Sequence, residues 1–360
     1  MLAVLYFGLY GIVGQFGAGT LVGLLEDDLF GAIVNPWVTA LIQQYVPWLA
    51  VQDLLVGEYG IFTLAVTYAL ALILPIVGTF FLVFSVIEDS GYLPRLALLI
   101  DRICKLIGLN GRAVIPLVLG FGCDTMATVV TRVLETKRER LIATMLMALA
   151  IPCSAQLGVV LGLLSFKPAA LAIWAVTVGL VFMLVGFLAA RLLPGEQPSF
   201  YMELPPLRLP QARNVLVKTY ARMEWYFFEV FPIFVAASVV IWVGQLTGIF
   251  QTLIAALQPV MLALGLPSDA AVVFLFGFFR RDYGAAGLYG LAQDGLLGGT
   301  QLVVAAVTLT LFLPCVAQFS VMIKERGLKS ALAIAAFVFP FAFAVGVALN
   351  ALLKVLGVTL

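Results

Sequence analysis

Three cysteines stand beside other metal-binding groups within strongly apolar stretches of this sequence. Cys123 lies in the run Gly120-Phe-Gly-Cys-Asp-Thr-Met-Ala, and Cys153 and Cys315 each follow a proline in two Pro-Cys-x-Ala-Gln motifs. Thiol, carboxylate, thioether and amide groups together with backbone carbonyls form a mixed sulfur–oxygen environment. Such an environment suits a borderline divalent ion better than Na⁺ or Mg²⁺, which prefer oxygen ligands alone. The candidate metal ligands are Cys123, Cys153, Cys315, Asp124 and Met126.

The same motifs interrupt the apolar stretches. A proline inside a helix removes one hydrogen bond and leaves the carbonyl four residues earlier without its partner. For Pro152 and Pro314 these carbonyls belong to Ala148 and Thr310. Irregular backbone at membrane depth is tolerated only where protein or a water-lined cavity satisfies it, so we expect the interruptions to line a path. The expected lining residues are Gly120, Gly122, Thr125, Pro152, Gln156, Pro314 and Gln318.

Each of these signals also has a purely structural interpretation. Glycines allow helices to pack closely, and a proline kink can carry a passive buried cysteine. Asp124 favours the functional interpretation, because a carboxylate inside a membrane is costly and usually lines a path. Cys104 lies on an amphipathic segment, and we interpret it as passive.

Charged residues occupy the corresponding place in the second half of the chain. Arg280, Arg281 and Asp282 stand in the run Phe278-Phe-Arg-Arg-Asp-Tyr, where the first half has its thiol and carboxylate. A charge so deep in an apolar run requires a partner, and Asp282 is the nearest candidate. The sequence leaves open whether these residues gate a path or stabilise the fold.

The composition indicates that lipid is the solvent of this chain. Apolar residues make up 63% of the 360 positions and charged residues only 11%, against about half and a quarter in soluble domains. The net charge of +1 gives no basic field for nucleic acid. Histidine is absent, which excludes imidazole catalysis. The four cysteines include no Cys-x-x-Cys pair, so no disulfide framework is expected.

The long apolar stretches predict an all-α polytopic membrane protein. Each spanning helix needs about 20 apolar residues. The first stretch has no basic segment before it, so we interpret it as a retained span and not as a signal peptide. The stretches are Leu2–Leu25, Ile61–Ile87, Ala113–Val130, Leu141–Ser165, Ala169–Leu193, Phe227–Leu246, Ala270–Leu291, Leu302–Ile323 and Ala331–Leu356.

The two halves of the chain resemble each other on either side of a proline-rich linker, Pro194–Pro210. In the first half, the run Ile107-Gly-Leu-Asn-Gly-Arg is followed by Gly120-Phe-Gly-Cys-Asp. In the second half, the run Leu264-Gly-Leu-Pro-Ser-Asp is followed at the same distance by Gly277-Phe-Phe-Arg-Arg. The two Pro-Cys-x-Ala-Gln motifs then match in the same order. We therefore predict a duplication. The predicted regions are an N-terminal span and amphipathic segment over 1–58, a first repeat over 59–193, a cytoplasmic linker over 194–225 and a second repeat over 226–360.

Charge placement favours a topology in which two of the stretches do not cross. If Ala113–Val130 and Ala270–Leu291 both spanned, the basic segment 132–140 would lie outside, against the positive-inside rule. If both are re-entrant, only Lys167 and Lys354 lie on the wrong face. We therefore predict about seven spanning helices plus two re-entrant segments, a cytoplasmic N-terminus and two inverted repeats. Inverted repeats with broken helices are typical of transporters.

Longer composite motifs resemble the ferrous iron transport protein B (FeoB) family over nearly the whole chain. Glu88-Asp-Ser-Gly-Tyr-Leu-Pro-Arg, Asp101-Arg and the run from Ile115 to Thr128 resemble its first gate region. Leu134-Glu-Thr-Lys-Arg-Glu-Arg and the Pro-Cys-x-Ala-Gln motifs continue the resemblance. The run Phe278-Phe-Arg-Arg-Asp-Tyr-Gly-Ala-Ala-Gly is similar to its second gate region, so the two repeats are interpreted as gate repeats.

The resemblance implies Fe²⁺ uptake across a bacterial or archaeal cytoplasmic membrane, with the three cysteines of the motifs along the path. Fe²⁺ is then the transported ion, and no permanently bound cofactor is expected. The resemblance also implies a cytoplasmic G domain, yet the sequence has no Gly-x-x-x-x-Gly-Lys-[Ser/Thr] loop. Guanine-nucleotide control is therefore expected from a separate or missing domain, and this chain is not predicted to be an enzyme. The partners considered are the lipid bilayer, that G domain and a second copy of the chain.

Two other functions fit the same sequence features. One is a gate-fold transporter of another solute, such as a nucleoside or another divalent metal. The other is a membrane scaffold that transports nothing. Flux measurements in proteoliposomes distinguish the three.

Overall fold

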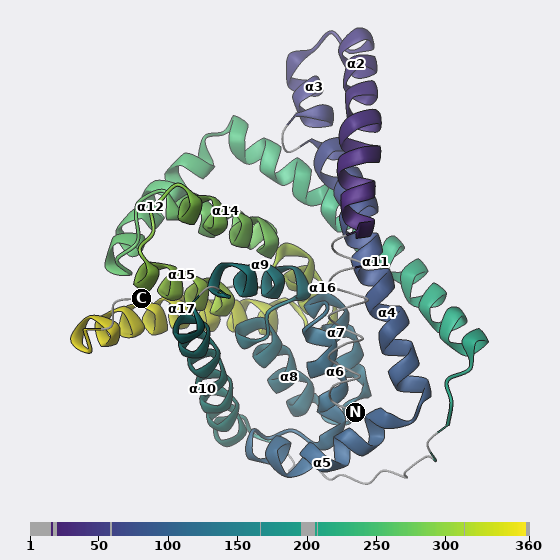
Figure 1. Cartoon of the computed structure of the whole chain (residues 1–360), viewed down its shortest axis with the longest axis vertical. Coiled ribbons are helices and arrows are strands. Elements are labelled where there is room, and N and C mark those ends of the chain that lie inside the picture. Colours follow the sequence, from purple (N-terminus) through teal and green to yellow (C-terminus); the bar gives the residue numbers. More distant parts are fainter. Residues whose placement is uncertain are drawn as a thin grey trace. The chain divides into compact units, whose positions relative to one another are not determined.

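The computed structural model describes residues 16, 20–57, 60–165, 167–195, 206, 208–312 and 314–357, and Figure 1 shows it as a cartoon. Every regular element within these ranges is a helix, which confirms the predicted all-α class. Most of the predicted span Leu2–Leu25 and most of the linker Pro194–Pro210 lie outside the described residues.

The chain forms two compact units, each assembled from two separate stretches of sequence. Unit 1 comprises Met1–Leu93 and Leu204–Phe250, and unit 2 comprises Pro94–Glu203 and Gln251–Leu360. The predicted regions 1–58, 59–193, 194–225 and 226–360 divide the chain by sequence similarity and linker composition, and they stay a prediction.

Ion pairs join the two main helices of unit 1. Its helices are the π-helical η2 (Leu24–Val34), η3 (Ile61–Val66) and η4 (Tyr68–Ile73), together with α2 (Asn35–Tyr45), α3 (Leu49–Val56), α4 (Leu74–Asp89) and α11 (Ala212–Leu246). Helices α4 and α11 pack side by side (Figure 1). Glu88, near the end of α4, accepts hydrogen bonds from Arg222 at 2.6 Å and Lys218 at 3.1 Å. Asp89 accepts one from Arg208 at 2.8 Å. Because these charges neutralise one another, the end of α4 is fixed against the start of α11.

Unit 2 contains the other helices, apart from the first residues of α5 and α12. They are α5 (Tyr92–Leu106), η5 (Gly111–Ala113), α6 (Val114–Gly120), α7 (Asp124–Val130), η6 (Thr131–Val133), α8 (Lys137–Ala150), α9 (Ser154–Leu164), α10 (Pro168–Leu192), α12 (Ile249–Ala263), α13 (Ala270–Phe279), α14 (Arg281–Gln293), α15 (Gly299–Leu311), α16 (Val316–Arg326) and α17 (Leu328–Val355). Every residue of α15 from Leu302 to Leu311 is buried. A helix that is apolar on all sides belongs at the centre of a bundle, and α10, α14, α17 and α8 surround this one.

Six helical stretches in the described part of the chain are long and apolar enough to cross a membrane. They are Ala69–Asp89, Lys137–Leu164, Pro168–Leu192, Ala212–Leu246, Gly299–Arg326 and Leu328–Val355. Each matches one predicted span, and the remaining predicted span, Leu2–Leu25, falls mostly outside the described residues. Helix α5 and the segment Gly111–Gly120 add one more candidate only if a pair bent by 107° counts as a single span. The predicted polytopic membrane fold is confirmed.

The two stretches predicted to be re-entrant each fold as a pair of short helices. Helices α6 and α7 are separated by a break that ends at Cys123, with φ −151° and ψ 112°. Helices α13 and α14 meet at Arg280, with φ −147° and ψ 117°. At 1.5 Å per residue, the longest of these helices covers about 20 Å, less than the hydrocarbon thickness of about 30 Å. The side of the membrane on which each pair enters and leaves stays a prediction.

Glycines allow the α13–α14 pair to fold back tightly. A Cβ atom on Gly284 would lie 2.9 Å from the Cα of Gly277 and 3.0 Å from Cδ1 of Leu309. Side chains larger than hydrogen at these positions would therefore push α14 away from α13 and from the central helix α15. The close packing of glycine faces is a general device of membrane helices.

The two Pro-Cys motifs break two of the six candidate spans. Helix α8 ends at Ala150 and α9 begins at Ser154, while α15 ends at Leu311 and α16 begins at Val316. Proline has no N–H to continue the hydrogen-bond ladder of the preceding helix, so the chain stays extended through each cysteine. Cys153 has φ −69° and ψ 164°, and Cys315 has φ −62° and ψ 160°.

Candidate metal pathway in the broken helices of unit 2

All three motif cysteines occupy the position directly before a helix. Cys123 precedes α7, Cys153 precedes α9 and Cys315 precedes α16. The backbone N–H groups three residues further on lie near the respective sulfurs, without closing a cap hydrogen bond. The positive end of each helix dipole therefore faces a thiol, which favours negative charge on the sulfur when a metal ion binds.

The broken helices bring these cysteines into one neighbourhood. Cys315 lies close enough to Cys123 and Cys153 for a charge on its sulfur to affect theirs. The Thr125 hydroxyl lies close to the Cys315 thiol. Ser154 donates from its hydroxyl and from its backbone N–H to the carbonyl of Gly122, at 3.0 and 3.2 Å. The break between α6 and α7 is thereby tied to the start of α9. Helices α7 and α16 lie side by side, as do α9 and α14 (Figure 1).

A buried ion pair lies among these helix ends. Nη1 of Arg281 lies 2.5 Å from Oδ2 of Asp124, and the two side chains are 4% and 3% exposed. Arg281 is the first residue of α14, and Asp124 is the first residue of α7. Two opposite charges removed from solvent stabilise a fold only when hydrogen bonds satisfy their remaining polar atoms.

The guanidinium of Arg281 also satisfies backbone carbonyls at the α8–α9 break. Nη2 donates to the carbonyl of Ala148 at 2.9 Å, and Nη1 donates to that of Ile151 at 3.0 Å. Ala148 precedes Pro152 by four residues, so its carbonyl is the one that the missing proline N–H leaves free. The kink at Pro152 therefore creates acceptors, and Arg281 fills them.

Asp124 and Arg281 occupy equivalent positions in the two predicted repeats. They are 157 positions apart, the same offset that relates the Gly-Phe runs of the two halves. Their neighbours Cys123 and Arg280 are equivalent in the same way and have nearly the same backbone conformation. If the two halves are related by an axis, equivalent residues near that axis lie close together, so the shared offset made this pair a candidate without deciding it.

The predicted partner for the arginines was Asp282, the nearest carboxylate in sequence. Arg281 instead pairs with Asp124, from the other predicted repeat. The side chain of Asp282 lies outside the described residues. The guanidinium of Arg280 lies over the ring of Tyr283, 3.9 Å from its centroid, and the residue is 6% exposed.

The two motif glutamines are completely buried, each on the first turn of the helix that follows a break. Gln156 donates from Nε2 to the carbonyl of Leu309 at 3.0 Å, which ties α9 to α15. Within the described part of the chain, Oε1 of Gln156 and both amide atoms of Gln318 have no hydrogen-bond partner. Buried polar atoms without partners are costly. These amide atoms of the two glutamines are therefore available to bind a further ligand.

The other predicted residues lie around the same breaks. Met126 is 5% exposed, on the first turn of α7. A Cβ atom on Gly120 would lie 3.1 Å from Cγ2 of Ile151 and 3.2 Å from Oδ1 of Asp124, so glycine keeps the chain close to the ion pair. Cys104, interpreted as passive, is buried on α5.

A conventional metal centre made only of side chains is not preformed in the described part of the chain. No three Cys, Asp or Glu side chains there are grouped closely enough to hold a metal ion. Backbone carbonyls and side-chain amides also lie at these helix breaks.

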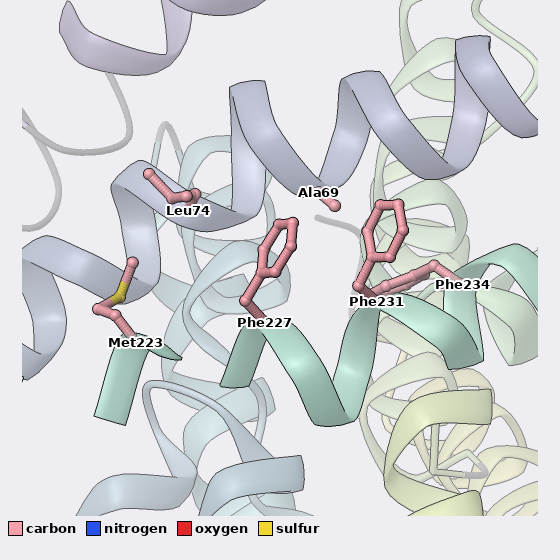
Figure 2. A pocket seen from close by; sticks show the side chains of 6 residues that line it. All are labelled: Ala69, Leu74, Met223, Phe227, Phe231 and Phe234. Carbon is pink, nitrogen blue, oxygen red and sulfur yellow. The ribbon is translucent and has the colours of Figure 1, made fainter. Parts of the chain in front are cut away.

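A pocket in unit 1 offers no alternative site for an ion. It lies between η4–α4 and α11, where Phe227 and Phe231 point from α11 toward Ala69 (Figure 2). Its lining is apolar: Ala69, Leu74, Met223, Phe227, Phe231 and Phe234. The only heteroatom among these side chains is the thioether sulfur of Met223, which is a weak ligand.

Similarity to known proteins covers both broken regions. The profile of the Gate family, described as nucleoside recognition, matches residues 70–167 and 227–329, which contain the cysteines and the ion pair. A profile described as the ferrous iron transport protein B C terminus matches residues 171–222. No solved structure matches the chain.

Several curated relatives are iron transporters by name. The "Fe(2+) transport protein A/Fe(2+) transporter FeoB fusion protein" of Porphyromonas gingivalis is 35% identical over 240 residues, covering 63% of this chain and 27% of the relative. The "Fe(2+) transporter FeoB" of Methanocaldococcus jannaschii is 28% identical over 345 residues, covering 86% of this chain and 49% of the relative. That of Staphylococcus aureus is 30% identical over 240 residues, covering 64% and 35%. This chain thus spans about half or less of each relative. These matches show that the chain belongs to the Gate family and, within it, to the FeoB proteins.

Proposed function

We propose that this chain forms the membrane pathway of a ferrous iron uptake system, with Cys123, Cys153 and Cys315 along the route of the ion. The observation that carries this proposal is the position of all three thiols at helix starts around one buried ion pair. The names of the relatives, which are Fe²⁺ transporters, support the choice of ion.

The arrangement suits a transported metal ion better than a permanently held one. Thiolate and carbonyl ligands together accept a borderline ion such as Fe²⁺. The helix dipoles offset part of the cost of a thiolate while the ion is bound. No group of three Cys, Asp or Glu side chains that would hold an ion permanently is found in the described residues, and this supports a transported ion.

The wider system is part of the same proposal. A G domain outside this sequence, on the same polypeptide or on another, would control the pathway from the cytoplasm. The protein would lie in the cytoplasmic membrane of a bacterium or archaeon, with its N-terminus in the cytoplasm and with a second copy as a further partner.

Uptake into proteoliposomes tests the pathway. The purified chain should carry Fe²⁺ inward, alone or with a supplied G domain, and Cys123→Ser, Cys153→Ser or Cys315→Ser should lower the rate by about tenfold or more, as ligand-shell changes do. Cys104→Ser, a buried thiol on α5, is the matched control and should leave the rate unchanged. Iron flux that survives all three motif substitutions contradicts the thiol route but not the transport of iron.

Because the Gate family is described as nucleoside recognition, a nucleoside is a second candidate solute for the same uptake measurement. Radiolabelled nucleoside added to the same vesicles should not accumulate. Nucleoside uptake without metal uptake would make this chain a nucleoside transporter, and uptake of neither would favour a scaffold.

A further inference from the structure

Three oxygen atoms around the Arg281 guanidinium form a ligand set that a metal cation also uses. They are Oδ2 of Asp124 at 2.5 Å and the carbonyls of Ile151 at 3.0 Å and Ala148 at 2.9 Å. One carboxylate with two carbonyls is a set that hard and borderline divalent cations accept. The guanidinium occupies the centre of this set.

The oxygen atoms are available because of the backbone and not because of Arg281. Pro152 leaves the carbonyl of Ala148 free, and Ile151 lies beyond the end of α8 in an extended conformation, with φ −104° and ψ 114°. Without a positive group between them, two buried carbonyls and a buried carboxylate would face one another unsatisfied. A cation of some kind is therefore needed at this point of the fold.

The pairing with Arg281 leaves buried polar atoms unused beside it. Among the described residues, Oδ1 of Asp124 and Nε of Arg281 have no hydrogen-bond partner, and neither does either amide atom of the completely buried Gln318 on the first turn of α16. Such atoms are costly in a finished structural ion pair. They are expected where a second arrangement, with a different cation in place, satisfies them.

We propose that Arg281 is a tethered, exchangeable cation that occupies a divalent-metal subsite made of the Asp124 carboxylate and the Ala148 and Ile151 carbonyls. An incoming metal ion displaces the guanidinium, and the guanidinium returns when the ion leaves. Because arginine stays charged under all conditions in a protein, Asp124 keeps a positive neighbour in both states, and the displaced guanidinium needs other acceptors near the helix breaks. The subsite lies beside the thiols and deepens the proposed function, on which it rests.

Binding of Mn²⁺ to the purified full chain in detergent, followed by the electron paramagnetic resonance signal of free Mn²⁺, tests the exchange. Mn²⁺ prefers oxygen ligands, so it reports this subsite and not the thiols. In Arg281→Lys the charge remains, but a single ammonium group cannot bridge the three oxygen atoms as a planar fork does. Both Arg281→Lys and Arg281→Gln should bind Mn²⁺ about tenfold tighter than the wild type or more, because the apparent affinity rises with the fraction of vacated sites.

The double variant Asp124→Asn/Arg281→Gln removes the carboxylate together with its partner and should bind Mn²⁺ no tighter than the wild type. Arg132→Lys is the matched control for an arginine-to-lysine change, since Arg132 is 63% exposed and pairs with Glu325; its Mn²⁺ binding should equal that of the wild type.

Three results would overturn the exchange. One is equal Mn²⁺ affinity of the wild type and the folded single variants, and another is tight binding by the double variant. The third is failure of both single variants to fold, because an obligatory structural pair cannot exchange. The proposed function is decided separately by Fe²⁺ uptake of the wild-type chain. Uptake without tighter Mn²⁺ binding refutes only the exchange, and tighter binding without uptake refutes only iron transport.

Discussion

At the scale of single residues, the charges of Asp124 and Arg281 depend on each other. Both side chains are almost completely buried, and Arg281 has further hydrogen bonds only to carbonyls. Removing one member of such a pair leaves an uncompensated charge in a medium that solvates it poorly. The cost is therefore much larger than the energy that the intact pair contributes.

Asp124→Asn should destabilise the folded chain by about 3–5 kcal/mol, because Arg281 then stays charged without a counter-ion. The measurement is the unfolding midpoint in detergent. Lys105→Gln is the control: its pair with Asp101 is half exposed on one helix, so its loss should cost less than about 1 kcal/mol. Equal midpoints for the two variants would contradict a buried charge pair.

At the scale of helices, the broken spans supply the acceptors that single residues then use. Pro152 and Pro314 end α8 and α15 where a membrane span would otherwise continue, and each break places a cysteine at the next helix start. Prolines elsewhere do not have this effect, since α17 continues through Pro340. The neighbouring sequence therefore decides whether a proline bends a helix or separates it into two.

Pro152→Ala should close the first break in part, because the restored N–H competes with Arg281 for the Ala148 carbonyl. We expect Fe²⁺ uptake to fall by about tenfold, the effect of disturbing the support of a metal ligand. Pro340→Ala, in a continuous helix, should leave uptake near the wild-type rate. Proteoliposome uptake measures both, and a Pro152→Ala chain as fast as wild type would show that the break is not needed.

The close approach of α13 to α14 gives a second prediction at this scale. Gly284→Ala should destabilise the chain by about 1–3 kcal/mol, since its Cβ has no room beside Gly277 and Leu309. Gly290→Ala is the matched control on the same helix: a Cβ there meets nothing within 4 Å, and alanine should stabilise α14 by up to about 1 kcal/mol. Thermal unfolding should therefore shift in opposite directions for the two variants, and a shift in the same direction would refute the packing argument.

At the scale of the whole molecule, the charge distribution predicts how the chain lies in a membrane. Helices α8 and α9 together form one candidate span from Lys137 to Leu164. The basic residues at the start of α8 are predicted on the cytoplasmic side, and Lys167, just beyond the end of α9, on the outer side. The two ends of this span therefore test its predicted orientation.

Lys167→Cys and Lys137→Cys are each introduced into a chain whose own four cysteines are replaced by serine. A membrane-impermeant maleimide applied to intact cells should label the Lys167→Cys chain but not the Lys137→Cys chain. Permeabilised cells should show labelling at both positions, which controls for reactivity. Labelling of position 137 from outside would reverse the predicted orientation.

The sequence by itself determined the helical membrane class, six of the predicted spans and the places where helices break. These features depend on local chemistry: an apolar run long enough for a bilayer, or a proline without an N–H, acts through its immediate neighbours. The motifs also placed Cys123, Cys153 and Cys315 among the broken segments. Their position directly before three helices followed from the backbone conformation and was not predicted.

Only the tertiary structure decided which charges meet. Asp282 is next to Arg281 in sequence, whereas Asp124 is 157 positions away and yet pairs with it. Pairing over such a distance depends on how two related segments approach each other in space, and the pattern along one segment carries no direct record of that approach. The same packing directs the Arg281 guanidinium to the carbonyl that Pro152 leaves free, because the first residue of α14 lies beside the last turn of α8 in space.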